Sequence, residues 1–204
     1  MKSVILILFL LPTYFISAQT DEKQLVFHDK EFLLDYYKQT KNNLSKSISG
    51  LSEAQMQFKP SEDKWSVSQC VEHIIATENM IFGMLKTYME QPENPDRKKD
   101  VVLSDDDILG FMTNRSEKYK APEMLQKKGI YNQPKVALKD FKNQRKELIN
   151  FIKKTDINEL RNRINDSPAG ATDAYQSLLF IAGHTARHTL QIDEVKNDPN
   201  FPKK

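Results

Sequence analysis

Three of the four histidines in the chain have a spacing that suits a metal ion. His184 and His188 are four residues apart in a stretch that predicts a helix, so their imidazoles project from the same face. Two imidazoles placed in this way can bind one ion at about 2.0–2.1 Å each. His73 lies among apolar positions of another predicted helix and can supply a third nitrogen. The fourth histidine, His28, precedes the first predicted helix and is expected at the surface.

The alternative interpretation is that these histidines are structural residues of a helical core. Burying three neutral imidazoles leaves several hydrogen-bond donors and acceptors to satisfy, and a metal ion resolves that problem. The pattern differs from the H-E-x-x-H of metalloproteases, because no glutamate follows His184. Three imidazoles leave a coordination position open, which can hold a water molecule of lowered pKa, a thiolate or a carboxylate.

Three residues near the predicted ligands have two interpretations each. Glu72 adjoins His73 but lies about 100° round the helix, so it is a hydrogen-bond partner near the metal or, as we favour, a surface acid. Gln191 follows His188 by three residues and either hydrogen-bonds near the site or, as we favour, packs between helices. Trp65 forms a pocket wall or, as we favour, anchors the preceding loop against the bundle.

Four further residues carry smaller expectations. Gly183 in mid-helix costs about 1 kcal/mol relative to alanine, which indicates close helix approach or room for the ligand cluster. Arg187 is expected to point away from the ligand face, into solvent or a subunit contact. Tyr175 is expected in the core. Cys70 has no partner in the chain and is interpreted as a buried inert thiol, with a reactive nucleophile as the alternative.

Every stretch with clear periodicity indicates a helix, and no run of alternating β-branched residues predicts a strand. The expected buried stripes include Met84 and Val136, and a polar connection is expected over Thr155–Ala171. Four long helices and one shorter helix are expected over Lys30–Ser49, Val67–Glu90, Lys135–Lys154, Thr172–Asn197 and, for the shorter one, Asp105–Tyr119. These elements predict an all-α fold, a four-helix bundle with long crossover connections.

The start of the chain has the pattern of a secretory signal peptide. A basic start precedes the apolar run Val4–Ala18, which is short for a bilayer span and contains Pro12. Cleavage is expected after Ala18, so residues 1–18 are the signal peptide and residues 19–204 a single domain. An uncleaved anchor is the alternative. The expected location is therefore periplasmic or extracellular.

Composition excludes several classes of protein. With 39% hydrophobic and 28% charged residues, the chain is neither disordered nor fibrous in pattern. Lys and Arg total 30 and Asp and Glu 28, a formal net charge of +2. No nucleic-acid partner is therefore expected. No membrane contact is expected after signal cleavage, because no predicted helix combines a basic face with a strongly apolar one.

Two groups of short motifs resemble the DinB-like superfamily. The first is a leucine-serine-x-x-glutamine at Leu51–Gln55, then Pro60, then Trp65-Ser66, with His73 eight residues after the tryptophan. The second is an H-x₃-H-x₂-Q-I pattern that starts at His184. The resemblance covers about Asp29 to Lys196. It implies a four-helix bundle with a long crossover, often dimeric, so that a homodimer is expected.

The resemblance also implies a divalent transition metal held by His73, His184 and His188, with zinc or nickel expected. Similar proteins include thiol-dependent transferases and isomerases, others described as metal-dependent hydrolases, and many with no known reaction. Export disfavours thiol transfer, because cellular thiol cofactors are mostly cytosolic. The predicted function is an exported metal-dependent hydrolase that uses a metal-bound water on an unknown small-molecule substrate. The alternatives are a thiol S-transferase-like enzyme and a non-catalytic metal-binding or stress-related module.

Overall fold

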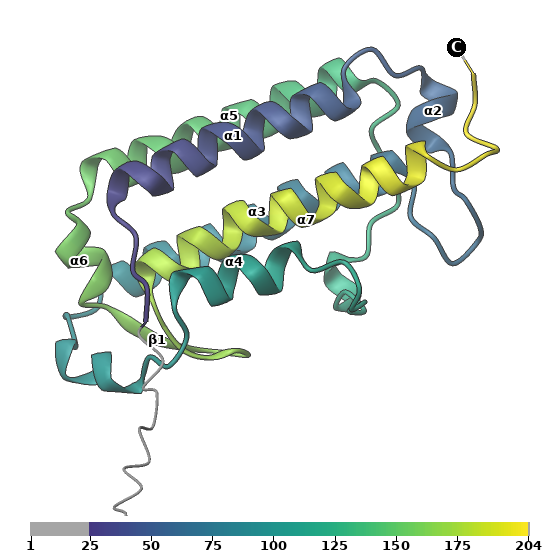
Figure 1. The fold of residues 1–204 in the computed structure, drawn as a ribbon. Helices are drawn as coiled ribbons and strands as arrows, with labels where there is room; N and C mark the ends of the chain where they lie inside the picture. The colour runs from purple at the N-terminus through teal and green to yellow at the C-terminus, as the bar shows by residue number, and fades with distance from the viewer. Residues whose placement is uncertain (1–24, 204) are drawn as a thin grey trace, which may run out of the picture.

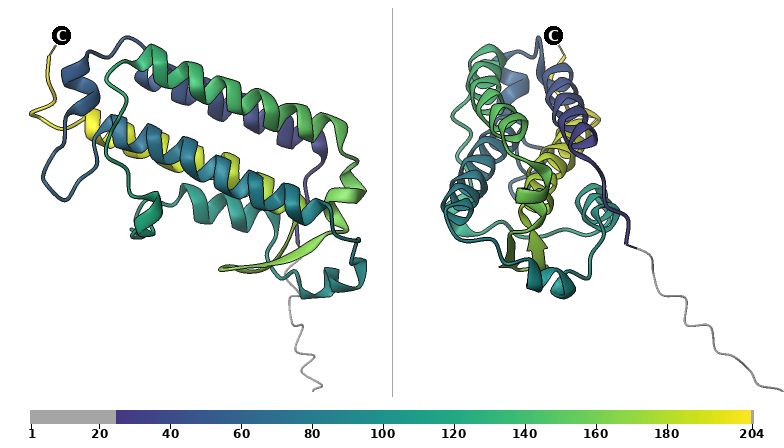
Figure 2. Two further views of the ribbon diagram at one scale, coloured as in Figure 1. Left: turned by 180° about the vertical axis from the view of Figure 1, so that it is seen from behind. Right: turned by 90° about the vertical axis from the view of Figure 1, so that its left-hand side faces the viewer.

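The computed structural model describes residues 25–203, and four long helices form its body (Figure 1). The bundle helices are α1 (Lys30–Ile48), α3 (Val67–Met89), α5 (Pro134–Lys154) and α7 (Ala174–Lys196). Seen from the side, α1 and α5 form one layer of the bundle, and α3 and α7 form the other (Figure 1 and the left view of Figure 2). The predicted all-α four-helix bundle is confirmed.

The bundle contains one long crossover, which connects α3 to α5. The start of α1 meets the end of α5, where Lys30 Nζ donates to the carbonyl of Thr155, so these two helices are antiparallel. The ends of α1 and α7 meet at Ser47 and Lys196, so these two run parallel. The connection between α3 and α5 spans the length of the bundle, as predicted, and contains helix α4 (Asp105–Thr113), which packs beside α7 (Figure 1).

Local capping explains where the long helices begin. Asp29 accepts the backbone N–H of Phe32 at the start of α1. Ser66 and Gln69 form a reciprocal capping box at the start of α3, and Asp173 accepts the N–H of Gln176 at the start of α7. The predicted long helices agree with the observed ones to within two residues at each end.

Two segments between the helices contradict the predictions. The segment predicted as a polar connection, Thr155–Ala171, begins with helix α6 (Ile157–Arg161) and continues into a two-stranded antiparallel hairpin, β1 (Ile164–Ser167) with β2 (Gly170–Asp173). The strands are four residues long and mostly polar, so they lack the alternation that predicts a strand. Gly170 supplies the positive φ of 101° in the turn. The expectation that the chain has no strand is therefore wrong.

Helix α4 is shorter than predicted, ending at Thr113 and not at Tyr119. Beyond Thr113 the backbone leaves the helix, and Arg187 of α7 donates to the carbonyls of Asn114 and Glu117 in this segment. The loop at 51–66 also holds a short capped helix, α2 (Glu53–Gln57), and two 3₁₀ turns, η1 (Pro95–Asp100) and η2 (Glu123–Leu125), lie between α3 and α5. Tertiary contacts of this kind override local propensity.

Two positions predicted for the buried stripes are exposed. Met84 on α3 and Val136 on α5 are 66% and 47% exposed. Both lie at the edge of an apolar stripe, where the helical periodicity does not decide whether a neighbouring helix covers the side chain.

A buried polar layer divides the core into two apolar clusters. One cluster surrounds Leu33 and Tyr175, and the other surrounds Ile48 and Phe141. Between them, the fully buried Arg145 of α5 pairs with the fully buried Glu78 of α3. Thr185 of α7 contacts both side chains. This layer ties three helices together directly beside His184.

Among the described residues, no helix is both long enough and apolar enough to cross a membrane. The predicted signal peptide, residues 1–18, lies outside the described residues.

Candidate metal centre

Helices α3 and α7 bring the three predicted ligands together. His73 lies in the second turn of α3, and His184 and His188 lie one turn apart on α7. The Nε2 atom of His184 is 3.1 Å from Nε2 of His73 and 3.1 Å from Nε2 of His188. All three residues are buried, each with at most 9% of its surface exposed. The arrangement is one that can hold a metal ion.

The spacing of the three nitrogens fits a transition-metal ion. Two nitrogens bound to zinc at 2.0–2.1 Å in tetrahedral geometry are separated by about 3.3 Å. The observed 3.1 Å between Nε2 atoms is close to that value. One nitrogen from each of the three rings lies within 4.8 Å of the other two, so a single ion can lie between them.

Hydrogen bonds on the far sides of two rings direct their lone pairs toward the centre. Nδ1 of His73 lies 2.9 Å from the carbonyl of Leu125, and Nδ1 of His188 lies 2.8 Å from Oε1 of Gln191. A carbonyl only accepts, so Nδ1 carries the proton in each neutral ring and Nε2 keeps its lone pair. Partners of this type orient the ligands of metal sites and raise their basicity.

His184 is the exception, because its buried Nδ1 has no hydrogen-bond partner among the described residues. Its Nε2 can donate to only one of the two facing nitrogens, and the other contact then joins two lone pairs. A cation between the three Nε2 atoms removes this conflict. The donor set therefore fits a metal ion better than it fits a metal-free core.

Burial keeps the three imidazoles neutral. It lowers the pKa of His73, and it lowers the pKa of His188 to about 3. The pKa of His184 lies well below its ordinary value because of burial and the two neighbouring imidazoles. Neutral imidazole is the form that binds metal, so the site is ready for an ion at neutral pH.

Two aromatic side chains flank the histidine rings. Trp65 packs edge-on against His73 at 4.8 Å between centroids and nearly parallel to His188 at 6.0 Å. Phe180 stacks on His184 at 6.1 Å. Both flanking residues are partly buried. Trp65 is therefore a wall of the candidate site as well as part of the loop that leads into α3.

Glu72 does not behave as the surface acid that we favoured, and it does not contact the ligands. Its carboxylate accepts the backbone N–H groups of Gly129 and Ile130 at 2.8 and 3.1 Å. These bonds fix the segment that presents the Leu125 carbonyl to His73. Glu72 therefore holds the backbone four and five residues after the Leu125 carbonyl that faces His73.

Arg187 is buried and not solvated, which corrects the prediction. Only 6% of its surface is exposed, and its guanidinium donates to the carbonyls of Met112, Asn114 and Glu117. It fastens the end of α4 and the following loop to α7. Nothing in the sequence around Arg187 signals this role, because the carbonyls come from a distant segment.

Gly183 makes the close approach that the sequence predicted. A Cβ atom placed there lies 2.9 Å from Cβ of Met112, which is closer than real Cβ contacts allow. Helix α4 therefore rests directly on the backbone of α7 beside His184.

Several other expectations can be compared with the structure. Cys70 is fully buried, and burial raises the pKa of its thiol to about 12, as expected for an inert thiol. Tyr175 is fully buried in the core, as predicted. Gln191 takes the hydrogen-bonding role that we did not favour. His28 is only partly exposed, with its ring 2.8 Å from the carboxylate of Asp106.

The sequence reading missed Glu78 and Arg145. Both occupy core positions of otherwise apolar stripes, since Glu78 follows Ile74 by four residues and Arg145 follows Phe141 by four. A charged residue of opposite sign inside the apolar stripe of each of two helices is the signal that predicts a buried ion pair. A cleft of about 520 Å³ between α1 and α7 was also not foreseen, and its lining includes none of the three histidines.

Comparison with known proteins bears on this geometry. The family model described as the DinB superfamily matches residues 36–192. No curated protein sequence matches the chain. A solved structure, YfiT from Bacillus subtilis, has a similar fold with a TM-score of 0.60 and 10% sequence identity, over 88% of this chain and 93% of that one. YfiT is described as a probable metal-dependent hydrolase with an unusual four-helix bundle topology.

Proposed function

Because the chain belongs to the DinB superfamily, we propose that it is an exported metal-dependent hydrolase whose divalent ion is held by His73, His184 and His188. The single observation that carries the proposal is the convergence of three buried Nε2 atoms from two helices. The description of YfiT as a probable metal-dependent hydrolase supports the type of reaction.

The proposed metal is zinc or nickel. Both ions accept imidazole ligands, and the number and type of ligands do not choose between them. When bound by three neutral imidazoles, such an ion supplies a Lewis acid with an open coordination position.

The residues of the chain have distinct parts in this proposal. The Leu125 carbonyl and the Gln191 side chain hold the rings of His73 and His188 in the orientation that binds metal. Trp65 and Phe180 cover the rings and limit the access of bulk water. The substrate is a small molecule that reaches the open position of the ion.

Export rests on the apolar run Val4–Ala18, and a homodimer rests on resemblance to the family. Export is tested by expressing the full chain and sequencing the N-terminus of the protein recovered outside the cytoplasm. A mature chain that starts at Gln19 supports export, and an intact chain that stays in the cytoplasm contradicts it.

The central test is elemental analysis of the purified protein together with titration of the metal-free protein with Zn²⁺ and Ni²⁺. We expect about one equivalent of metal per chain in the wild type and at least a hundredfold weaker binding in His188→Ala. The matched control is His28→Ala, which removes the histidine that lies outside the centre and should bind metal as the wild type does. Equal binding by wild type and His188→Ala, or no binding by either, would overturn the proposed centre.

The reaction type is tested on the metal-loaded protein with ester, amide and phosphoester substrates. Hydrolysis that is lost in His188→Ala supports the proposal. Transfer of a low-molecular-weight thiol in place of hydrolysis would favour the transferase alternative. Metal binding with no turnover of either kind would favour a binding module.

A further inference from the structure

Three buried side-chain atoms among the described residues have no hydrogen-bond partner: Thr77 Oγ1, Arg145 Nε and His184 Nδ1. The Arg145 guanidinium lies over the rings of Tyr37 and Phe141, at 4.5 and 5.1 Å from their centroids. Aromatic faces are favourable neighbours for that cation. The atoms that remain without an explanation are those of Thr77 and His184.

Thr77 differs from the other threonines on the helices. Thr40, Thr87, Thr113 and Thr189 each donate their hydroxyl to the carbonyl four residues earlier, and Thr185 donates its hydroxyl to the carboxylate of Glu78. Such bonds are the usual solution for a threonine inside a helix. The Thr77 hydroxyl makes no such bond, although only 4% of the residue is exposed. Its hydroxyl is therefore free to serve a partner outside its own helix.

The register of α3 and α7 places Thr77 at the level of His184. Thr77 follows His73 by four residues, so it lies on the same face of α3, and that face meets His184. The next residue on each helix gives a second link, because Glu78 Oε1 and Thr185 Oγ1 are 2.5 Å apart. The residues of α3 that make these contacts, His73 and Glu78, lie on either side of Thr77 in the sequence, and they reach His184 and Thr185 of α7.

Metal binding determines which nitrogen of His184 carries the proton, and therefore which of its atoms needs a hydrogen-bond acceptor. To give its Nε2 lone pair to an ion, neutral His184 must carry its proton on Nδ1. That N–H is then a buried donor, and the other two ligands already have acceptors in Leu125 and Gln191. His184 lacks one.

We propose that the Thr77 hydroxyl is the acceptor for the Nδ1–H of His184, and that Thr77 is a positioning residue for this ligand. A rotation about χ1 of Thr77 or a single enclosed water molecule completes the link, and Thr77 is the acceptor in both cases. All three ligands are then held from behind, one each by a backbone carbonyl, an amide and a hydroxyl. This inference rests on the proposed function, since it concerns the ligands of the same ion.

The test compares Zn²⁺ affinity in three variants, measured by competition with a coloured chelator. Thr77→Val keeps the shape of the side chain and removes the hydroxyl, so we expect at least tenfold weaker binding. Thr77→Ser keeps the hydroxyl and should bind within about threefold of the wild type. The matched control is Thr87→Val on the exposed side of the same helix, which should leave the affinity unchanged.

A second measurement separates positioning from general damage to the fold. In the zinc-loaded wild type, ¹⁵N-edited NMR should show a slowly exchanging Nδ1–H of His184. Thr77→Ser should retain this resonance, and Thr77→Val should shift it and speed its exchange while the Nδ1–H signals of His73 and His188 stay in place. If Thr77→Val does not fold, the wild type and Thr77→Ser still decide the matter, because a fast-exchanging His184 Nδ1–H in both overturns the proposal.

The outcomes also distinguish the role of Thr77 from the proposed metal centre on which it rests. Tight zinc binding by the wild type with the same affinity in Thr77→Val overturns the role of Thr77 and leaves the metal centre standing. No zinc binding by the wild type overturns both.

Discussion

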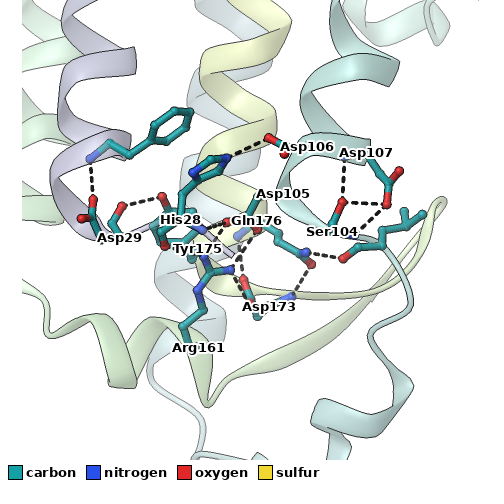
Figure 3. Close-up of polar contacts among 12 residues, drawn as sticks. His28, Asp29, Ser104, Asp105, Asp106, Asp107, Arg161, Asp173, Tyr175 and Gln176 are labelled. Atoms are coloured by element: carbon teal, nitrogen blue, oxygen red, sulfur yellow. Dashed lines mark hydrogen bonds and ion pairs between the residues drawn. The ribbon is translucent and has the colours of Figure 1, made fainter. Parts of the chain in front are cut away.

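Two polar clusters at different levels of α7 are built on opposite principles. Around the first turn of α7, groups of opposite charge meet, and Arg161 lies between Asp105 and Asp173 (Figure 3). Around His184, three groups of the same kind meet, each a neutral imidazole with its Nε2 turned inward.

The Arg161 cluster lies where three helices begin. The N-terminal ends of α1, α4 and α7 meet at this end of the molecule (Figure 1), and each has an acidic or serine cap. Arg161 donates to both aspartates and to the carbonyl of His28, and its guanidinium lies 3.6 Å from the centroid of the Tyr175 ring. The charges of this cluster are balanced within the chain, because the arginine faces two aspartates and the acidic caps lie at the positively polarised N-termini of helices.

The difference separates a polar cluster whose charges pair within the chain from one whose side chains could bind a metal ion. The Arg161 cluster contains its own cation, so it needs nothing from outside. The histidine cluster brings together nitrogen lone pairs that could bind a metal ion, and such an ion would satisfy them.

The largest effect is expected for Arg161→Ala. Removing the cation leaves Asp105 and Asp173 buried without their partner, so the free energy of unfolding should fall by about 3–5 kcal/mol. Urea denaturation followed by circular dichroism measures this loss. The control is Arg163→Ala, whose acidic partners are about 40% exposed and keep their contact with water, so its loss should cost less than that of Arg161.

The number of zinc ions bound by Arg161→Ala tests whether the Arg161 cluster and the histidine cluster are independent. Arg161→Ala that still folds should bind about one equivalent of Zn²⁺, because Arg161 contacts none of the three histidines. Loss of zinc binding in folded Arg161→Ala would contradict the separation of the two clusters.

An intermediate effect is expected from pH. The pKa of His188 is about 3 in the folded protein and about 6.5 when the chain is unfolded, so below pH 6.5 the unfolded chain binds the additional proton. The stability that neutral His188 contributes is therefore present above pH 6.5 and is lost as the pH falls toward 3.

This effect is measured on the metal-free protein by denaturation at pH 7.5 and pH 5.5. The stability of the wild type relative to His188→Ala should fall by about 1.4 kcal/mol between the two values. A difference between the two proteins that does not change with pH would mean that His188 takes up its proton in the folded state, and that it is not held neutral by burial.

The smallest effect is expected for Gly183→Ala, where α4 rests on α7 beside the centre. The added Cβ must displace Met112, at a cost of about 1–3 kcal/mol, while alanine regains about 1 kcal/mol of helix propensity. A net loss of about 1 kcal/mol should appear in thermal denaturation. Gly110→Ala is the control, because no atom lies within 4 Å of its Cβ position and the variant should be stabilised.

The long helices could be predicted because each combines a cap with an apolar stripe. Ser66 with Gln69 and the residues that follow predict α3 to within one residue of its observed end. The pair His184 and His188 could be anticipated for the same reason, since a spacing of four within a helix fixes which side chains share a face. His73 could be added because it lies among apolar positions of α3 and matches the motif of the family.

The surroundings of the triad could not be predicted, because they come from segments distant in sequence. The Leu125 carbonyl that orients His73 is 52 residues away, and it belongs to a loop whose path depends on Glu72. A backbone carbonyl carries no signal of residue type. The hairpin of β1 and β2 was missed because its eight residues are held by the turn and by Asn94, and not by an alternating pattern.

The separation of the ligands along the chain has a consequence for the unfolded state. His73 and His184 are 111 residues apart, yet their Nε2 atoms lie 3.1 Å from one another. An ion shared by them would act as a removable cross-link, and closing a loop of about 100 residues with a covalent link contributes on the order of 4–5 kcal/mol through chain entropy. With a single cysteine, the chain cannot make such a staple for itself from a disulfide. Withdrawing the ion would therefore be, for this molecule, what reduction is for a disulfide-bonded protein.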